Sequence, residues 1–429
     1  MEKSRRLTLA EAAALVRPRD TLACGLVAGQ PAGFLEALGA RRDLEDVVLY
    51  TGLLLQPYAL LQTPGVRIVS GFFGPIERMA RAMGGRVTYI PRDFNGLERL
   101  ALDLAPRVML AVTSPPDAGG YLSFGVHAGA TYRPFLAAAH DPTRLAIAEI
   151  NPRMPRLRGL PELGGNRVHV SEVDVLVEHD AEIVTIADPQ PSAADIAIAR
   201  QVCERIAPDA ILQFGIGAIP NAIAALLAER GPGDFGIHTE MLSDGVMRLH
   251  QAGAVANRKP LYDGVTVATF ALGSRALYDW LDGNPDVCIL PVTAVNGPEV
   301  LAQLPRLTSV NGAIAIDLAG QIAADTIGER QYSGTGGHEA FVSGAGSAPG
   351  GQSFICTRST ATVHGAPVST IVAEFAPGTR VTTPRHHAQW IVTEHGAVDL
   401  SVLDDDERPR ALVELADPRF RDALRATLR

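Results

Sequence analysis

The sequence predicts an α/β protein with two similar domains whose sheets are mainly parallel. Short apolar runs rich in β-branched residues alternate with stretches of helical period, which is the pattern of strands joined by crossover helices. The chain has 429 residues, and one core rarely grows that large, so two domains of roughly 200 residues are expected. A short internal echo relates two distant strand-to-helix segments, as expected for two similar halves.

Five apolar runs in the first half are expected to be strands. They lie at residues 47–50, 66–69, 108–112, 145–148 and 173–177. None approaches the roughly 18 consecutive apolar residues of a membrane span. The N-terminus leads into a helix-like pattern rather than a continuous apolar segment, so no signal peptide is predicted.

The boundary between the domains is expected at residues 187–195, a segment with two prolines and no apolar periodicity. The predicted domains are therefore 1–186 and 187–429. The echo relates residues 21–38 to 210–227, each reading as a strand, a glycine turn, a proline and an alanine-rich helix. Proline suits the first turn of a helix because its missing N–H would be unpaired there.

The composition disfavours several classes of binding partner. The hydrophobic fraction is 47% and the charged fraction 20%, as in a well-buried globular protein. Basic residues number 38 against 47 acidic ones, for a net charge of −9, and no run of Lys or Arg is dense enough to predict nucleic-acid binding. The four cysteines form no CxxC pair, which disfavours a zinc site or a disulfide framework. We expect a cytoplasmic enzyme with no membrane partner.

A glycine turn at residues 213–220 is the first candidate site. A strand ends there in two glycines and passes into a helix, so backbone N–H groups and the helix dipole could hold a phosphate or a developing oxyanion. Pro220 replaces the third glycine of a dinucleotide fingerprint, and the lysine of a P-loop is lacking. An ordinary turn between a strand and a helix fits these residues equally well.

Glu240 is the second candidate, about twenty residues further on within 236–245. In a parallel sheet the strand before it would end at the same edge as the glycine turn. The carboxylate could instead hold a ribose, as in a dehydrogenase, or merely start a surface helix. His238 and Glu240 also match the HxE of zinc deaminases, but no PCxxC follows, so that interpretation fails.

Two further regions are candidates for ligand contact. Residues 331–351 form the most glycine-dense part of the chain, where backbone could approach a ligand or supply amides, although a surface loop would look the same. Residues 114–121 follow a predicted buried strand as a proline-rich loop. The histidines at 386, 387 and 395 do not indicate a metal site. No GxSxG elbow and no activated cysteine is recognisable, which leaves a carboxylate as the candidate nucleophile.

Eight segments, in the same order along nearly the whole chain, resemble the acetyl-CoA hydrolase/transferase family, close to its 4-hydroxybutyrate and succinate CoA-transferase members. They are residues 114–125, 149–155, 169–174, 215–220, 236–241, 317–321, 332–337 and 392–396. Gln352 departs from the resemblance, since many relatives carry lysine there, and so does the segment 398–409.

The resemblance implies two domains of sugar-phosphate-isomerase-like topology, the first on the acyl and carboxylate side and the second carrying the catalytic glutamate. It implies Glu240 as that glutamate and Gly217 and Gly337 as backbone donors to the oxyanion. The residues that it implies for CoA binding are Gly215, Ile216, Gly217, Ala218, Ile219, Asn296, Gly336 and Gly337.

The activity implied is transfer of CoA between an acyl-CoA and a carboxylic acid, by ping-pong catalysis through a glutamyl-CoA thioester on Glu240. CoA would then be a substrate, with no metal and no tightly bound cofactor, and a homodimer is expected from the family. Three alternatives stay open at this point. They are acyl-CoA hydrolysis through the same intermediate, a sugar-phosphate isomerase or nucleotide-binding module, and a non-catalytic acyl-CoA sensor.

Overall fold

The computed structural model describes residues 4–187 and 189–428, which form two compact units. The N-terminal unit comprises Met1–Ile186 and Val267–Val295, and the C-terminal unit comprises Ala187–Thr266 and Asn296–Arg429. The division predicted from sequence falls at the same first boundary. It assigns residues 267–295 to the C-terminal domain, whereas their contacts lie within the N-terminal unit.

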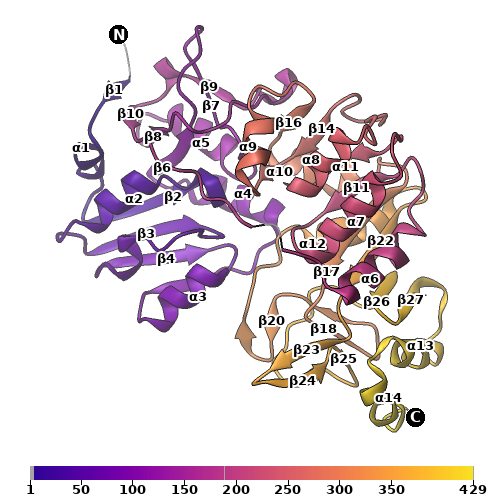
Figure 1. Cartoon of the computed structure of the whole chain (residues 1–429). Helices are drawn as coiled ribbons and strands as arrows, with labels where there is room; N and C mark the ends of the chain where they lie inside the picture. The colour runs from indigo at the N-terminus through magenta and orange to yellow at the C-terminus, as the bar shows by residue number, and fades with distance from the viewer. Residues whose placement is uncertain (1–3, 188, 429) are drawn as a thin grey trace. The chain divides into compact units, whose positions relative to one another are not determined.

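The N-terminal unit is built on an eight-stranded sheet in the order β1-β10-β8-β6-β2-β3-β4-β5, in which every neighbouring pair is parallel (Figure 1). The sequence runs predicted as strands all fall in it, although β10 begins two residues late because a 3₁₀ turn, Val170–Glu172, precedes it. Its strands are β1 (Arg5–Arg6), β2 (Arg19–Cys24), β3 (Asp46–Thr51), β4 (Val66–Ser70), β5 (Val87–Tyr89), β6 (Val108–Thr113), β8 (Leu145–Ile150) and β10 (Val175–Glu178).

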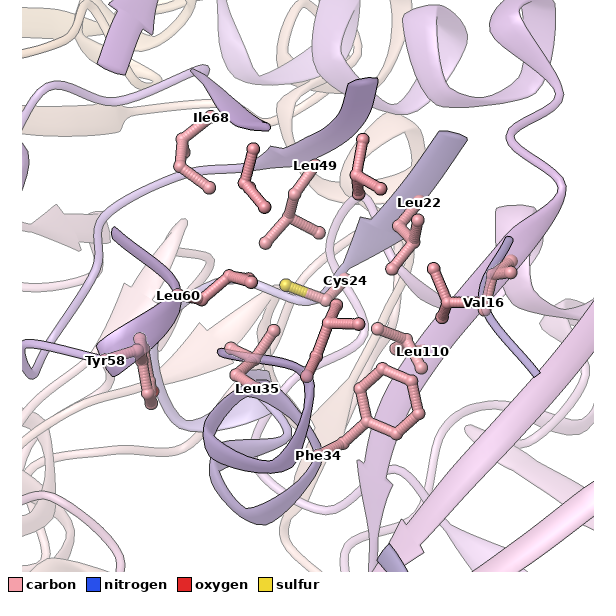
Figure 2. Close-up of a cluster of buried hydrophobic side chains, with 14 of the residues drawn as sticks. Val16, Leu22, Cys24, Phe34, Leu35, Leu49, Tyr58, Leu60, Ile68 and Leu110 are labelled. Atoms are coloured by element: carbon pink, nitrogen blue, oxygen red, sulfur yellow. The ribbon is translucent and has the colours of Figure 1, made fainter. Parts of the chain in front are cut away.

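Helices join several of these strands, as is usual for parallel pairing, and one more lies in residues 267–295. They are α1 (Leu9–Ala13), α2 (Ala32–Gly39), α3 (Pro75–Ala82), α4 (Phe94–Leu104), α5 (Tyr132–Ala139) and α9 (Arg275–Leu281). A short antiparallel pair joins β7 (Tyr121–Ser123) to β9 (Arg167–His169). The core includes Phe34 and Leu35 of α2, which lie with Leu22, Leu49 and Leu110 of the sheet in Figure 2 and are fully buried.

The first copy of the echo forms β2 and α2, with Pro31 at the N-cap of the helix. The first N–H groups of α2 are hydrogen-bonded within the unit, because the buried Glu149 carboxylate accepts from those of Gly33 (3.3 Å) and Phe34 (2.8 Å). His179 Nδ1 lies 2.9 Å from the same carboxylate. This helix N-terminus therefore already has an internal anion.

The C-terminal unit is built on a six-stranded sheet in the order β12-β11-β17-β22-β26-β27. Its pairs are parallel except for the last, which is antiparallel. The strands are β11 (Ile211–Phe214), β12 (Gly236–Ile237), β17 (Leu307–Gly312), β22 (Gln352–Cys356), β26 (Trp390–Thr393) and β27 (Gly396–Asp399).

Seven helices accompany this sheet in the described residues. They are α6 (Ala193–Cys203), α7 (Ala218–Ala228), α8 (Asp244–Gln251), α11 (Pro298–Leu301), α12 (His338–Ser347), α13 (Glu407–Leu415) and α14 (Pro418–Arg425). The predicted linker 187–195 is wrong at its end, because Ser192 caps α6 and residues 193–195 are helical.

Shorter elements complete the chain. They are β13 (Met241–Leu242), β14 (Thr266–Ala268), β15 (Phe270–Ala271), β16 (Val287–Ile289), α10 (Val292–Asn296), β18 (Ala315–Asp317), β19 (Ile322–Ala323), β20 (Thr326–Ile327), β21 (Arg330–Gln331), β23 (Thr360–Val363), β24 (Ala366–Ser369) and β25 (Ile371–Val372). Within the described ranges, no helix is long and apolar enough to cross a bilayer.

Candidate active site

The second copy of the echo carries the glycine turn, between β11 and α7. Gly217 is the N-cap of α7 and has φ +123° and ψ 175°, a conformation that is open to glycine and strained for any other residue. A Cβ built on Gly215 would have no neighbour within 4 Å, and one on Gly217 would reach only Pro220 Cδ, at 4.0 Å. Unlike the first copy, this turn leaves open space above its backbone.

A pocket of about 270 Å³ lies over this turn. It opens at the carboxyl ends of β11, β17 and β22, the edge of a parallel sheet where ligands usually bind. Its lining residues are Gly215, Ile216, Gly217, Ala218, Ile219, Pro220, Val310, Asn311, Gly312, Cys356, Asp195 and Arg358. The turn therefore forms one wall of a cavity that also contains a cation.

Arg358 provides the positive charge of this pocket. Its guanidinium donates to both carboxylate oxygens of Asp195, from Nε at 2.8 Å and Nη2 at 2.7 Å. The Asp195 side chain is 1% exposed, whereas that of Arg358 is 51% exposed. Burial alone would raise the pKa of Asp195, but hydrogen bonds from Arg358 and Ser192 outweigh it and lower the pKa. A buried, ionised carboxylate thus orients a half-exposed guanidinium.

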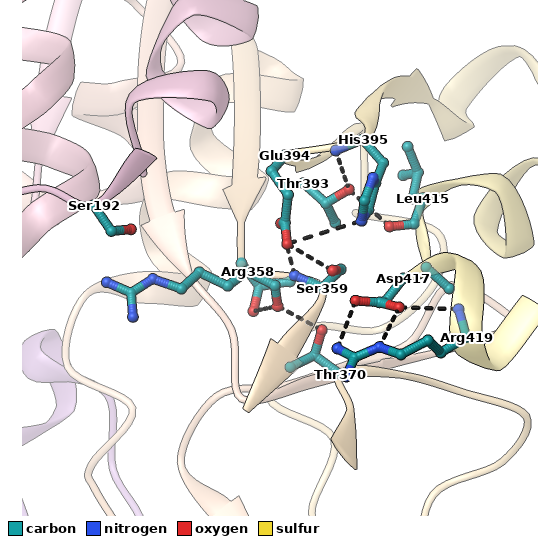
Figure 3. A network of polar contacts seen from close by, with 12 residues as sticks. Ser192, Arg358, Ser359, Thr370, Thr393, Glu394, His395, Leu415, Asp417 and Arg419 are labelled. Atoms are coloured by element: carbon teal, nitrogen blue, oxygen red, sulfur yellow. Dashed lines mark hydrogen bonds and ion pairs between the residues drawn. The ribbon is translucent and has the colours of Figure 1, made fainter. Parts of the chain in front are cut away.

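The backbone around Arg358 is fixed as well (Figure 3). Thr370 Oγ1 donates to the Arg358 carbonyl at 2.7 Å. The next residue, Ser359, donates to the Glu394 carboxylate from its N–H (2.8 Å) and its hydroxyl (2.7 Å). Glu394 belongs to the predicted family segment 392–396, so this segment holds the strand end that carries Arg358.

Glu240 follows the neighbouring strand, β12. Because β12 pairs in parallel with β11, the strand end before Glu240 adjoins the glycine turn, as the sequence predicts. Thr239 links the two strand ends. Its Oγ1 lies 3.1 Å from the Phe214 carbonyl oxygen and 3.0 Å from the Met241 carbonyl oxygen. His238 is buried and stacks on Tyr262 with ring centroids 6.0 Å apart.

Three predicted site residues meet at the Glu240 carboxylate. Asn296 Nδ2, fully buried at the end of α10, donates to Glu240 Oε2 at 2.5 Å. Gly337 is the N-cap of α12, and a Cβ built on it would overlap the Glu240 carboxylate and lie 2.6 Å from Asn296 Nδ2. A side chain at position 337 would therefore displace the carboxylate or the amide from its present position.

Gly337 stands between Gly336 and His338 at the start of α12. His338 follows Gly337, and burial lowers its pKa to about 4, against a smaller opposing effect of Asp325. This histidine is neutral at pH 7. Gly336, on the other side of Gly337, has φ +55°.

The structure brings Glu240, Asn296 and Gly337 together, and it places Gly215, Ile216, Gly217, Ala218 and Ile219 around a pocket whose lining does not include those three. A carboxylate held by an amide can attack a carbonyl carbon, and the glycine turn on the adjoining strand, together with Arg358, can bind an anionic group. Sequence reasoning missed Asp195 and Arg358. Asp195 was assigned to the linker. Arg358 lies two residues past a strand and belongs to no recognised motif.

The fold is that of a CoA transferase. A solved 4-hydroxybutyrate CoA-transferase from Porphyromonas gingivalis matches with TM-score 0.79 and 27% identity, over 98% of this chain and 96% of that one. RipA from Yersinia pestis matches with TM-score 0.90 and 33% identity, over 99% of this chain and 96% of that one.

Sequence comparison identifies the family. The model of the acetyl-CoA hydrolase/transferase C-terminal domain matches residues 273–428. Succinyl-CoA:cyclohexane-1-carboxylate CoA transferase of Geobacter metallireducens is 35% identical over 419 residues, which cover 96% of this chain and 92% of that protein. An acetyl-CoA hydrolase of Yarrowia lipolytica is more distant, 26% identical over 222 residues, half of this chain. The chain belongs to the acetyl-CoA hydrolase/transferase family.

Proposed function

We propose that this protein is a CoA transferase that moves CoA between an acyl-CoA and a carboxylic acid through a glutamyl-CoA thioester on Glu240. The observation that carries the proposal is the contact of the Glu240 carboxylate with Asn296 Nδ2 at 2.5 Å, which a Cβ at position 337 would displace. The transferase names of the more similar relatives support transfer over hydrolysis.

The reaction begins when a Glu240 oxygen attacks the thioester carbonyl carbon of the acyl-CoA. The carbon–sulfur bond breaks, CoA leaves as the thiolate, and an acyl-glutamyl anhydride forms. The thiolate then attacks the glutamyl carbonyl of the anhydride and expels the first acid as its carboxylate. The product is a glutamyl-CoA thioester, and no proton or electron has been gained or lost.

A second carboxylate reverses these steps. It attacks the glutamyl thioester, displaces the thiolate and forms a new anhydride, whose acyl carbonyl the thiolate attacks to release a new acyl-CoA and Glu240. Each attack creates a tetrahedral oxyanion, which needs donors already in place. Asn296 Nδ2 and the backbone at Gly337 and Gly217 are the donors that we propose.

The pocket over the glycine turn is the proposed CoA site. CoA carries phosphate groups, which suit the amides at the start of α7 and the guanidinium of Arg358. All of these residues belong to the C-terminal unit.

Consumption of acyl-CoA tests transfer against hydrolysis. Acetyl-CoA, butyryl-CoA and succinyl-CoA are each supplied with and without a carboxylate acceptor, and the loss of thioester is followed. A transferase produces a new acyl-CoA only with acceptor and gives parallel lines in double-reciprocal plots. Equal loss of acyl-CoA without acceptor, or full activity of Glu240→Ala, contradicts the proposal.

A further inference from the structure

Lys259 stands out first by its rarity. Of the 38 basic residues only two are lysines, at positions 3 and 259. Lys259 is also 5% exposed, whereas basic side chains are seldom buried unless they are hydrogen-bonded. A chain that uses arginine almost everywhere keeps the smaller ammonium at one buried position.

The Lys259 ammonium bridges two backbone carbonyls. Nζ donates to the carbonyl oxygen of Ile237 at 2.7 Å and to that of Val265 at 2.6 Å. Its stem crosses Gly236, where a Cβ would lie 2.9 Å from Lys259 Cγ and 3.0 Å from Cδ. An ammonium can serve two carbonyls from one compact point, while the planar guanidinium of arginine is larger.

Ile237 belongs to β12, the edge strand that leads to Glu240. On its inner side the strand is held by β11, since Gly236 N–H donates to Ala210 (3.0 Å) and His238 N–H to Leu212 (3.1 Å). On its outer side the backbone of residues 254–257 pairs with Phe235, just before the strand, and side chains pair with Ile237. The Ile237 carbonyl accepts from Lys259, and the Ile237 N–H donates to Asn257 Oδ1 at 2.9 Å. Both backbone groups of Ile237 are thus paired.

Asn257 is itself fixed for this task. It is 3% exposed and has φ +54°, a conformation that asparagine tolerates better than most residues. Its Nδ2 donates to Thr266 Oγ1 at 3.1 Å, and its own N–H donates to the Phe235 carbonyl at 3.0 Å. The Asn257 and Lys259 side chains therefore form a clamp on the outer edge of β12, at Ile237.

We propose that Lys259, with Asn257, is a positioning residue that sets the register of β12 and so places the Glu240 carboxylate against Asn296 and Gly337. Glu240 lies three residues beyond Ile237, whereas Asn296 and Gly337 belong to α10 and the start of α12. Beyond Phe235 the outer side of this two-residue strand is held by these two side chains, and without them the strand end could shift along its neighbour and Glu240 would move with it. This inference rests on the proposed function of Glu240.

The test is Lys259→Met, which keeps the chain length and removes the charge. We expect kcat to fall between about tenfold and a hundredfold, because a displacement of the order of 1 Å has that effect. KM for acyl-CoA should stay unchanged, since the pocket over the glycine turn is untouched. Amide hydrogen exchange should rise in the peptide covering residues 236–241 and stay unchanged at residues 215–219.

Arg41→Met is the matched control, because Arg41 Nη1 likewise bridges two backbone carbonyls, those of Ala13 (2.7 Å) and Val16 (2.6 Å), in the N-terminal unit. It should leave kcat as in the wild type. If Lys259→Met does not fold, Asn257→Gly replaces it, because glycine keeps the positive φ and removes the side chain. The same kcat, KM and exchange measurements then test the inference.

Four results overturn the inference: kcat unchanged in the folded variant, kcat lowered without faster exchange at 236–241, a rise of KM alone, or an equal loss of kcat in Arg41→Met. If the wild type transfers no CoA, the proposed function fails, and the exchange at 236–241 still reports whether Lys259 clamps the strand.

Discussion

Gly337→Ala places one methyl group against the Glu240 carboxylate. The added Cβ would overlap a carboxylate oxygen and lie 2.9 Å from Glu240 Cδ and 2.6 Å from Asn296 Nδ2, well inside normal contact distances of 3.5–4.0 Å between carbon atoms. Gly337 has φ −94° and ψ 7°, which alanine can adopt, so the backbone itself need not change. The substitution therefore acts on the side-chain contact alone.

The size of the effect follows from that geometry. Relief of the overlap requires the carboxylate to move by about 1 Å, which corresponds to a loss of about a hundredfold in kcat, or about 2.7 kcal/mol in the activation free energy. The free energy of unfolding should fall by only about 1 kcal/mol, because at most one partly solvated hydrogen bond is lost.

The assay is steady-state transfer of CoA to a carboxylate acceptor, with thermal unfolding measured in parallel. Gly346→Ala is the control in the same helix, since a Cβ there meets nothing within 4 Å and should slightly stabilise α12. The contact at Glu240 does not govern the reaction if Gly337→Ala keeps kcat within about twofold of the wild type. The same conclusion follows if kcat falls as far in Gly346→Ala as in Gly337→Ala.

Three further outcomes are expected. Gly217→Ala should lower both the melting temperature and the CoA affinity, because alanine is strained at a φ of +123°. Gly215→Ala should lower the CoA affinity measured by calorimetry and leave the melting temperature unchanged. Arg358→Met should weaken CoA about tenfold to a hundredfold with kcat unchanged, and salt should weaken the wild type more than this variant. Burial lowers the pKa of His127 to about 4, below its unfolded value near 6.5. Between these two pH values the unfolded chain is protonated at His127 and the folded chain is not. Stability should therefore fall as pH drops from about 6.5 to 4, by up to about 1.4 kcal/mol per pH unit, and His127→Gln should flatten this slope in denaturant titrations.

The sheet edge that carries the site could be predicted from sequence, because parallel strands of known order end on one side. That reasoning placed the strand before Glu240 beside the glycine turn, and the pairing of β11 with β12 confirms it. Spacing alone left the role of Glu240 open. Glu240 contacts Asn296, 56 positions further along the chain, and Gly337, which is further still. The periodicity of a sequence carries information on local structure only, so it cannot predict such contacts.

The residues that sequence reasoning missed share a physical cause. Asp195 and Arg358 are 163 positions apart and meet only because α6 and the end of β22 adjoin in the folded unit. Two prolines made the region of Asp195 resemble a linker, although Ser192 and Asp195 form a capping box, a local signal that could have revealed the helix start. Residues 267–295 lack any such local signal for the unit with which they pack.

Mass spectrometry of the Glu240 peptide tests the central proposal most directly. The protein is mixed with acyl-CoA without acceptor, quenched in acid and digested, beside Glu240→Ala as control. The proposal predicts a CoA adduct on the peptide that contains Glu240, which disappears when a carboxylate acceptor is added and never forms in the variant. An active protein that carries no adduct, or an adduct that persists in Glu240→Ala, contradicts it.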